Sequence, residues 1–152
     1  MNTNQETPLG YINLSPEPAQ ILFSAYTTNI DTKSGKYITF DTFLVNNGDD
    51  FNLSTGEFIA PVKGKYEFAI SVTSTNESHW TYISVFKNGN EVLQFLGNKG
   101  HSLNSPSWIL SLDSGDNIRL LNSGSSDFVT GTAAYCVFNG KLLELEWHPM
   151  SQ

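Results

Sequence analysis

The clearest pattern in the chain is an alternation of apolar and polar side chains over residues 65–72, where Tyr66, Phe68, Ile70 and Val72 occupy every second position. Such alternation is typical of a strand with one face against a core. Two other stretches repeat it, through Ile38, Phe40 and Leu44 and through Trp108, Leu110 and Leu112. We therefore predict that each of these sets lies on the inner face of a strand.

Short polar clusters rich in Gly, Asn, Asp and Ser separate the apolar stretches, at 47–50, 54–56, 63–64, 88–90, 114–116 and 122–124. These residue types favour turns. No window keeps the helical period of about 3.6 residues for long. Many short strands joined by such turns indicate an all-β sandwich or barrel.

Two stretches, 82–86 and 135–143, place apolar residues on both faces of the expected strand. A strand with one face in water would alternate, so these strands need a second cover. A sister subunit could supply that cover, and so could a loop or the N-terminal arm of the same chain. The pattern leaves both possibilities open.

The chain of 152 residues is long enough for one domain with a core, and its 39% hydrophobic content excludes a disordered polymer. Residues 1–19 hold three of the six prolines and little periodicity. We expect a flexible N-terminal arm over 1–19, a domain over 20–147 and a short C-terminal tail over 148–152.

The formal net charge is −7, and the eight basic residues are scattered along the chain. Nucleic acid and anionic membranes attract clustered Lys and Arg, so neither is an expected partner. No apolar stretch approaches the length of a membrane span, and residues 1–20 show no signal peptide.

A dense run of motifs fills residues 51–68: an aromatic residue followed by Asn, then Thr55-Gly56-x-Phe58, then Pro61, then Gly64-x-Tyr66-x-Phe68. Further matching segments lie in order at 23–25, 38–41, 46–48, 86–89, 110–116 and 138–143. Together they resemble the signature of the C1q domain family, over roughly residues 20–146.

This resemblance implies an all-β, ten-stranded jelly-roll sandwich of the tumour-necrosis-factor type, assembled as a compact homotrimer and extracellular. Within it, the large apolar residues expected in the core or the trimer interface are Tyr66, Phe68, Tyr82, Phe86, Tyr135 and Phe138. Many family members carry a collagen stalk, but this chain has no Gly-X-Y triplets.

Glycine and aspartate in the motifs have structural explanations. We expect Gly56 and Gly64 to serve turns with unusual backbone angles. Asp116 follows a glycine in a turn, where its carboxylate can accept hydrogen bonds from backbone amides.

Polar loops at strand ends are the candidate ligand-binding segments, and they span 74–80, 98–105 and 122–127. An exposed aromatic beside amides and imidazoles suits a sugar or protein ligand. The alternative is that the aromatic is buried and the loops are merely solvated. The candidate residues are Asn76, His79, Trp80, Asn98, His101, Asn104 and Asp127.

Catalytic, cofactor and metal chemistry find no support in the sequence. No two of the three histidines, His79, His101 and His148, have the spacing of zinc ligands. We expect Cys136 to be a small buried apolar residue. No nucleophile elbow, P-loop or dinucleotide fingerprint is present. Some relatives bind calcium after the Asn-Gly turn, but segment 94–101 has no carboxylate here. Asp49, Asp50 and Asp127 are an alternative cation site that we rank below a solvated loop.

The resemblance to the C1q domain family, together with the polar loops, implies a non-enzymatic recognition module that binds glycans or other surface ligands, as in pattern recognition by innate immunity. The rival hypothesis is a receptor-directed signal or structural organiser that acts through protein contacts.

Overall fold

The computed structural model describes residues 20–28, 33–129 and 136–146, which form strands and no helix. The predicted arm over 1–19 and tail over 148–152 lie outside the described residues. In chain order the strands are β1 Leu22–Thr27, β2 Thr42–Asn47, β3 Phe51–Asn52, β4 Glu57–Ile59, β5 Gly64–Thr73, β6 Trp80–Lys87, β7 Asn90–Lys99, β8 Leu103–Asn104, β9 Ser107–Leu112, β10 Asn117–Asn122 and β11 Cys136–Leu145.

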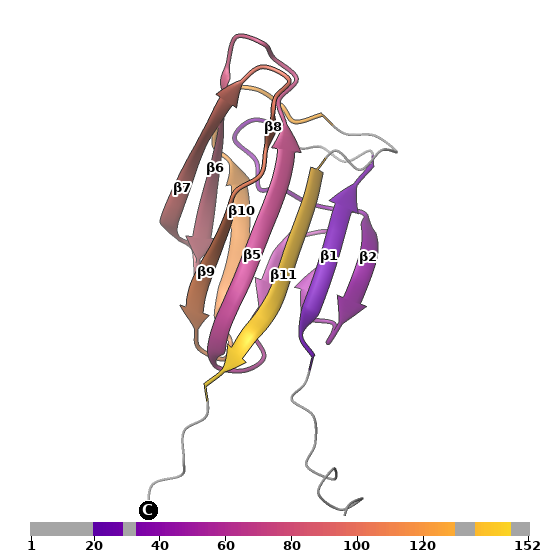
Figure 1. Ribbon diagram of the computed structural model, residues 1–152, viewed down its shortest axis with the longest axis vertical. Helices are drawn as coiled ribbons and strands as arrows, with labels where there is room; N and C mark the ends of the chain where they lie inside the picture. The colour runs from indigo at the N-terminus through magenta and orange to yellow at the C-terminus, as the bar shows by residue number, and fades with distance from the viewer. Residues whose placement is uncertain (1–19, 29–32, 130–135, 147–152) are drawn as a thin grey trace, which may run out of the picture.

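The strands form two antiparallel sheets that face each other as a sandwich (Figure 1). The first sheet has the order β2-β1-β11-β5, and both β8 and β9 pair with β5 at its far side. The second sheet has the order β3-β4-β10-β6-β7. This arrangement confirms the all-β jelly roll. The described residues hold eleven strands rather than the expected ten, because segments as short as two residues, such as β3 and β8, count separately.

Strand β5 confirms the predicted alternation, since Tyr66, Phe68, Ile70 and Val72 are all fully buried. Phe138 of β11 lies among five aromatic rings, with centroid distances from 5.1 Å to Phe23 up to 6.5 Å to Trp108. Tyr66, Phe68 and Phe138 therefore belong to the core between the sheets.

Leu44 breaks the predicted alternation, because its side chain is 61% exposed while Ile38 and Phe40 are buried. Ile38 and Phe40 precede β2, and within β2 it is Phe43 that pairs with the buried Ala25 and packs against the core. Phe43 is three residues after Phe40, so the alternation changes phase where the chain enters β2, and Leu44 points away from the core. The expectation that Leu44 shares the inner face was therefore wrong.

One of the two outer aromatic residues of strand β6, Phe86, is covered from the same chain. Ile83 and Val85 face the core, whereas Tyr82 and Phe86 are half-buried on the outer face. Tyr37 packs edge-on against Phe86 at 5.7 Å, and its segment bonds to β10 through the amide of Ile38 and the carbonyl of Leu120 (2.8 Å). Tyr135, the corresponding candidate before β11, lies outside the described residues.

The two motif glycines serve different purposes. Gly56 has φ of +71°, as predicted, and a Cβ there would collide with the Ile38 carbonyl. Gly64 has no such backbone angle. A Cβ on it would lie 2.5 Å from the Glu144 carbonyl oxygen, so glycine allows β11 to pass closely. The expectation of an unusual turn angle at Gly64 was wrong.

Candidate functional site

Three connections meet at one end of the sandwich, at the top of Figure 1. They join β5 to β6, β7 to β8, and β10 to β11, and the last is described as far as residue 129. We call this surface the loop end and define it as residues 74–80, 99–102 and 123–129. The three predicted candidate segments thus contribute to one end of the molecule.

Thr75 connects the three loops through its main chain and its hydroxyl. Its N–H and Oγ1 both donate to the Asp127 carbonyl, at 2.9 and 3.1 Å, and its own carbonyl lies 3.1 Å from His101 Nε2. The Asp127 carboxylate accepts the Ser34 N–H at 3.0 Å. Of the predicted residues, His101 and Asp127 are therefore brought together through Thr75. Nothing in the sequence distinguished Thr75 from other loop threonines.

A buried polar network fixes these loops from below. Ser74 and Ser126 share a hydrogen bond of 2.5 Å between hydroxyls, and Asn122 Nδ2 donates to the Ser126 carbonyl at 3.0 Å. All three residues are buried. Such satisfied buried groups favour one conformation of the loops above them.

Trp80 begins β6 at the loop end and is 44% exposed. The ammonium of Lys99, its cross-strand partner, lies 5.1 Å from the centre of the indole ring. A cation over an aromatic face is attracted by the ring quadrupole. Because Trp80 is exposed, the alternative in which this aromatic side chain is buried is wrong. Its contact with Trp80 adds Lys99 to the candidate ligand-binding residues.

Asn76 and His79 are less accessible to a ligand than Trp80, since both are half-buried. The Asn76 side-chain oxygen accepts the Ser78 N–H at 2.7 Å, which shapes the turn. Among the described contacts, the buried Nδ1 of His79 has no hydrogen-bond partner.

Asn98 and Asn104 belong to the flank of the sandwich. They line a cleft of about 290 Å³ between β7 and β8, together with Leu96 and Leu103. Asn104 is 7% exposed, and its side chain is occupied: Oδ1 accepts the Asn98 N–H at 2.7 Å, and Nδ2 donates to the Ser102 carbonyl at 3.0 Å. Asn104 therefore holds β7 and β8 together, and its side chain is not presented to a ligand.

The chemistry of the loop end is that of hydrogen bonding and aromatic contact. The described residues include no cluster of three or more metal-ligating side chains. Cys136 is buried in the core, and burial raises the pKa of its thiol to about 12, so it is not an activated nucleophile. In the described ranges no helix has the length and hydropathy to span a bilayer.

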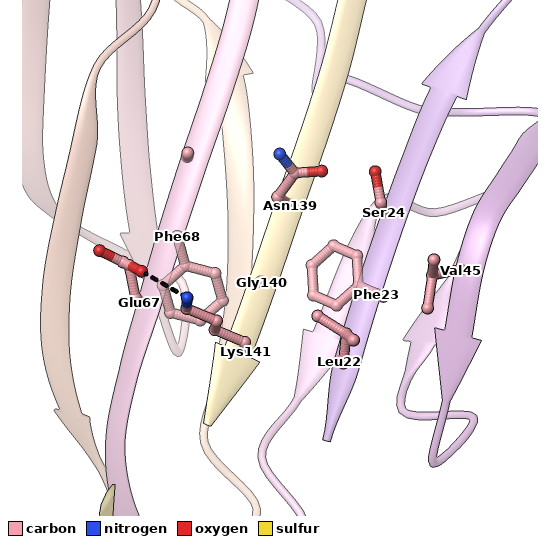
Figure 2. A pocket seen from close by; sticks show the side chains of 10 residues that line it. Leu22, Phe23, Ser24, Val45, Glu67, Phe68, Asn139, Gly140 and Lys141 are labelled. Carbon is pink, nitrogen blue, oxygen red and sulfur yellow. Dashed lines mark ion pairs between the residues drawn. The ribbon is translucent and has the colours of Figure 1, made fainter. Parts of the chain in front are cut away.

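A second candidate surface is the outer face of the first sheet, where a shallow depression of about 280 Å³ lies over β1, β11 and β5. Figure 2 shows Leu22, Ser24 and Val45 along one side and the Glu67–Lys141 ion pair (3.3 Å) along the other. Gly140 lies in the middle of this depression. The mixed apolar and polar lining is suited to contact with another protein surface.

Comparison with known proteins agrees with this architecture. The model of the C1q domain family matches residues 22–143. Complement C1q tumor necrosis factor-related protein 2 of Mus musculus is 34% identical over 104 residues, which are 67% of this chain and 35% of that protein. Complement C1q tumor necrosis factor-related protein 3 of Mus musculus is 32% identical over 108 residues, 69% of this chain and 44% of that protein. The chain thus spans less than half the length of these curated relatives.

Solved structures share the fold. The globular domain of zebrafish complement 1qA protein has a TM-score of 0.64 at 24% identity and covers 83% of this chain and 99% of that one. Eiger TNF from S. frugiperda has a TM-score of 0.62 at 11% identity and covers 89% and 99%. The family match spans most of the chain, and its motifs lie in the strands and turns described above. The chain therefore belongs to the C1q domain family.

Proposed function

We propose that this protein is a non-enzymatic, extracellular homotrimer in which the loop end of each copy binds a glycan or another ligand on a surface. The observation that carries this proposal is the convergence of three loops on Thr75, beside an exposed Trp80. Loops that a rigid sandwich positions are the usual place for recognition in β folds. Membership of the C1q domain family supports the trimer and the extracellular location.

The chemistry of the loop end supports weak binding at each single site, which the symmetry of a trimer would strengthen. Trp80 and Lys99 offer an aromatic and a cationic contact, and His101 and Asp127 offer polar groups a short distance away in the fold. Three copies of such a site in one trimer gain avidity when they reach one target.

A glycan array probed with the intact protein tests this proposal, with and without a calcium chelator. We expect saturable binding that the free sugar competes and that the chelator leaves unchanged. Trp80→Ala should weaken it by at least about tenfold, because aromatic anchors dominate binding energies. Leu44→Ala, which truncates another exposed apolar side chain on β2, is the control.

Binding that Trp80→Ala leaves intact would contradict a role for the loop end. An array without hits, combined with capture of a cell-surface protein by the same trimer, would instead support the rival function of a receptor-directed signal or organiser.

A further inference from the structure

A pocket of about 260 Å³ lies far from the loop end, on the outer side of the second sheet. Its residues come from β4, β6, β10, the turn between β6 and β7 at the opposite end of these strands (Figure 1), and the segment that precedes β2. Its lining includes Tyr37, Glu57, Phe86, Asn88, Asn117 and Arg119. The proposed ligand surface of the loop end shares no residue with it.

Arg119 is the one arginine in the sequence, and it has an unusual environment. The described residues form four ion pairs within 4 Å, and a lysine provides the cation in each. The Arg119 guanidinium instead stacks on the Tyr37 ring at 3.7 Å and donates from Nη2 to the Thr55 carbonyl at 2.9 Å. Its Nε is buried and has no hydrogen-bond partner among the described residues.

Glu57 lines the same pocket, yet it forms no ion pair with Arg119. The Glu57 carboxylate accepts a hydrogen bond from Asn117 Nδ2. Asn117 is held in turn, because its N–H donates to the Asn88 side-chain oxygen at 2.8 Å. The Arg119 guanidinium and the Glu57 carboxylate are thus each held by other partners and do not contact each other.

The buried Nε of Arg119 leaves a hydrogen-bond donor unused, and an unused buried donor is costly in a folded protein. A guanidinium can only donate hydrogen bonds, and a carboxylate can only accept them. A ligand that contacts both must accept at Arg119 and donate at Glu57. Hydroxyl groups do both.

Size and charge narrow the ligand further. The volume is slightly below the about 300 Å³ at which pockets for drug-sized ligands begin, so one ring-sized group fits. The two charges in the pocket cancel, and the chain as a whole carries −7, which disfavours an anion. Phe86 and Tyr37 add apolar surface for the carbon skeleton of a ligand.

We propose that the Arg119–Glu57 pocket binds a neutral polyhydroxyl ligand of the size of one sugar ring. This site is separate from the loop end, and the proposal does not depend on the function proposed above.

Titration of the ¹⁵N-labelled full chain with neutral methyl glycosides of glucose, galactose, mannose and N-acetylglucosamine tests the proposal by NMR. We expect at least one of them to shift the amide signals of Asn88 and Asn117 and the Arg119 Nε–H signal, with a Kd in the millimolar range. Glu57→Gln should weaken this binding by about tenfold, the effect of losing one charged hydrogen-bond acceptor.

The controls separate the pocket from general effects. Glu67→Gln makes the same chemical change on the other sheet and should leave the shifts of the pocket signals unchanged. Arg119→Lys keeps the charge but loses the planar donor group, and it should weaken binding as Glu57→Gln does. Thermal unfolding of each variant shows that the fold persists.

Three results would overturn the proposal. The first is the absence of shifts in the pocket with every glycoside. The second is stronger binding of acetate or methyl glucuronide, which would assign the pocket to an anion. The third is a strong energetic coupling between Arg119 and Glu57 in a double-mutant cycle on ligand-free protein, which would show that the two charges pair with each other.

Discussion

Asp116 shows how one side chain joins two turns at the end of the sandwich opposite the loop end. Its Oδ2 accepts the Asp113 N–H at 2.8 Å, its Oδ1 accepts Asn88 Nδ2 at 2.9 Å, and Lys87 lies 3.5 Å away. Burial by itself would raise the pKa of Asp116, but the hydrogen bonds from Asn88 and Asp113 and the charge of Lys87 outweigh it, so this pKa is lowered. The predicted role of Asp116 as an acceptor for backbone amides is confirmed.

This lowered pKa predicts a pH-dependent contribution to stability. Because the folded pKa of Asp116 lies below its ordinary value of 3.8, its contribution is complete above that value and is lost as the pH falls through the folded pKa. We expect Asp116→Asn to lower the free energy of unfolding at pH 7 by about 1 kcal/mol, and by less at pH 3. Urea unfolding at both pH values measures this.

Asp50 also has a shifted pKa, but it does not affect the difference in stability between wild type and Asp116→Asn. Burial, together with the neighbouring charge of Asp49, raises the pKa of Asp50, so its contribution to stability runs the other way with pH. Asp50 is present in both proteins and cancels in their difference. A difference between wild type and Asp116→Asn that grows towards pH 3 would contradict the assignment.

At the scale of elements, β11 depends on one glycine that faces the core. Gly140 is buried opposite Phe68 of β5 and Phe23 of β1. A Cβ at this position would lie 2.7 Å from Phe23 Cζ and 3.0 Å from Phe68 Cδ1. The two rings therefore occupy the space that a side chain would need.

We expect Gly140→Ala to destabilise the protein. Replacing a strand glycine by alanine can gain up to about 1 kcal/mol from the unfolded chain, but overpacking a core costs about 1–3 kcal/mol. The net loss should be visible in chemical denaturation. Asn139→Ala, on the exposed neighbouring position, is the control and should change the free energy of unfolding little. Equal stability of wild type and Gly140→Ala would show that the rings yield without cost.

The buried face of a strand was predictable where apolar and polar residues alternate without interruption along the whole strand. In β5 the alternation extends over the whole strand, and the buried face follows from the sequence. The exposure of Leu44 was not predictable, because the pairing of β2 with β1, which is distant in the chain, decides that Phe43 and not Leu44 faces the core. The unusual angle at Gly56 was predictable from its turn, whereas Gly64 is required by the approach of β11.

At the scale of the whole molecule, one edge of the sandwich carries exposed apolar side chains. Strands β7, β8 and β9 lie along this edge (Figure 1), and they expose Val92, Leu96, Leu103 and Ile109 by 42–66%. The depression of Figure 2 lies on the outer face of the first sheet. Packing the edge of one copy against the face of the next makes a heterologous contact, which closes into a ring of three if the rotation allows.

We expect Ile109→Asp to break the proposed homotrimer, because it would place an unpaired carboxylate in the proposed contact. Light scattering after size exclusion should give three times the chain mass of 16.8 kDa for wild type and lower masses for the variant. Ile59→Asp is the matched control, since Ile59 is 50% exposed on the second sheet. A wild type at the mass of one chain, or an Ile109→Asp protein that stays trimeric, would contradict this model.

The candidate site could be predicted as a set of loops but not as a set of contacts. Polar loops at strand ends are visible in the sequence, because Gly, Asn and Ser favour turns. The link from Thr75 to Asp127 joins residues 52 positions apart. Whether Asn104 faces a ligand or holds β7 likewise depends on packing, and so does the separation of Arg119 from Glu57.

The sequence by itself determined the all-β class, the inner face of β5 and membership of the C1q domain family, because alternation, turn residues and ordered motifs are local. The tertiary structure decided the exposure of Leu44, the cover of Phe86 by Tyr37 and the meeting of the three loops. These depend on which distant strands pair and in which register, and backbone hydrogen bonds and core packing select the register only when the whole sandwich is assembled.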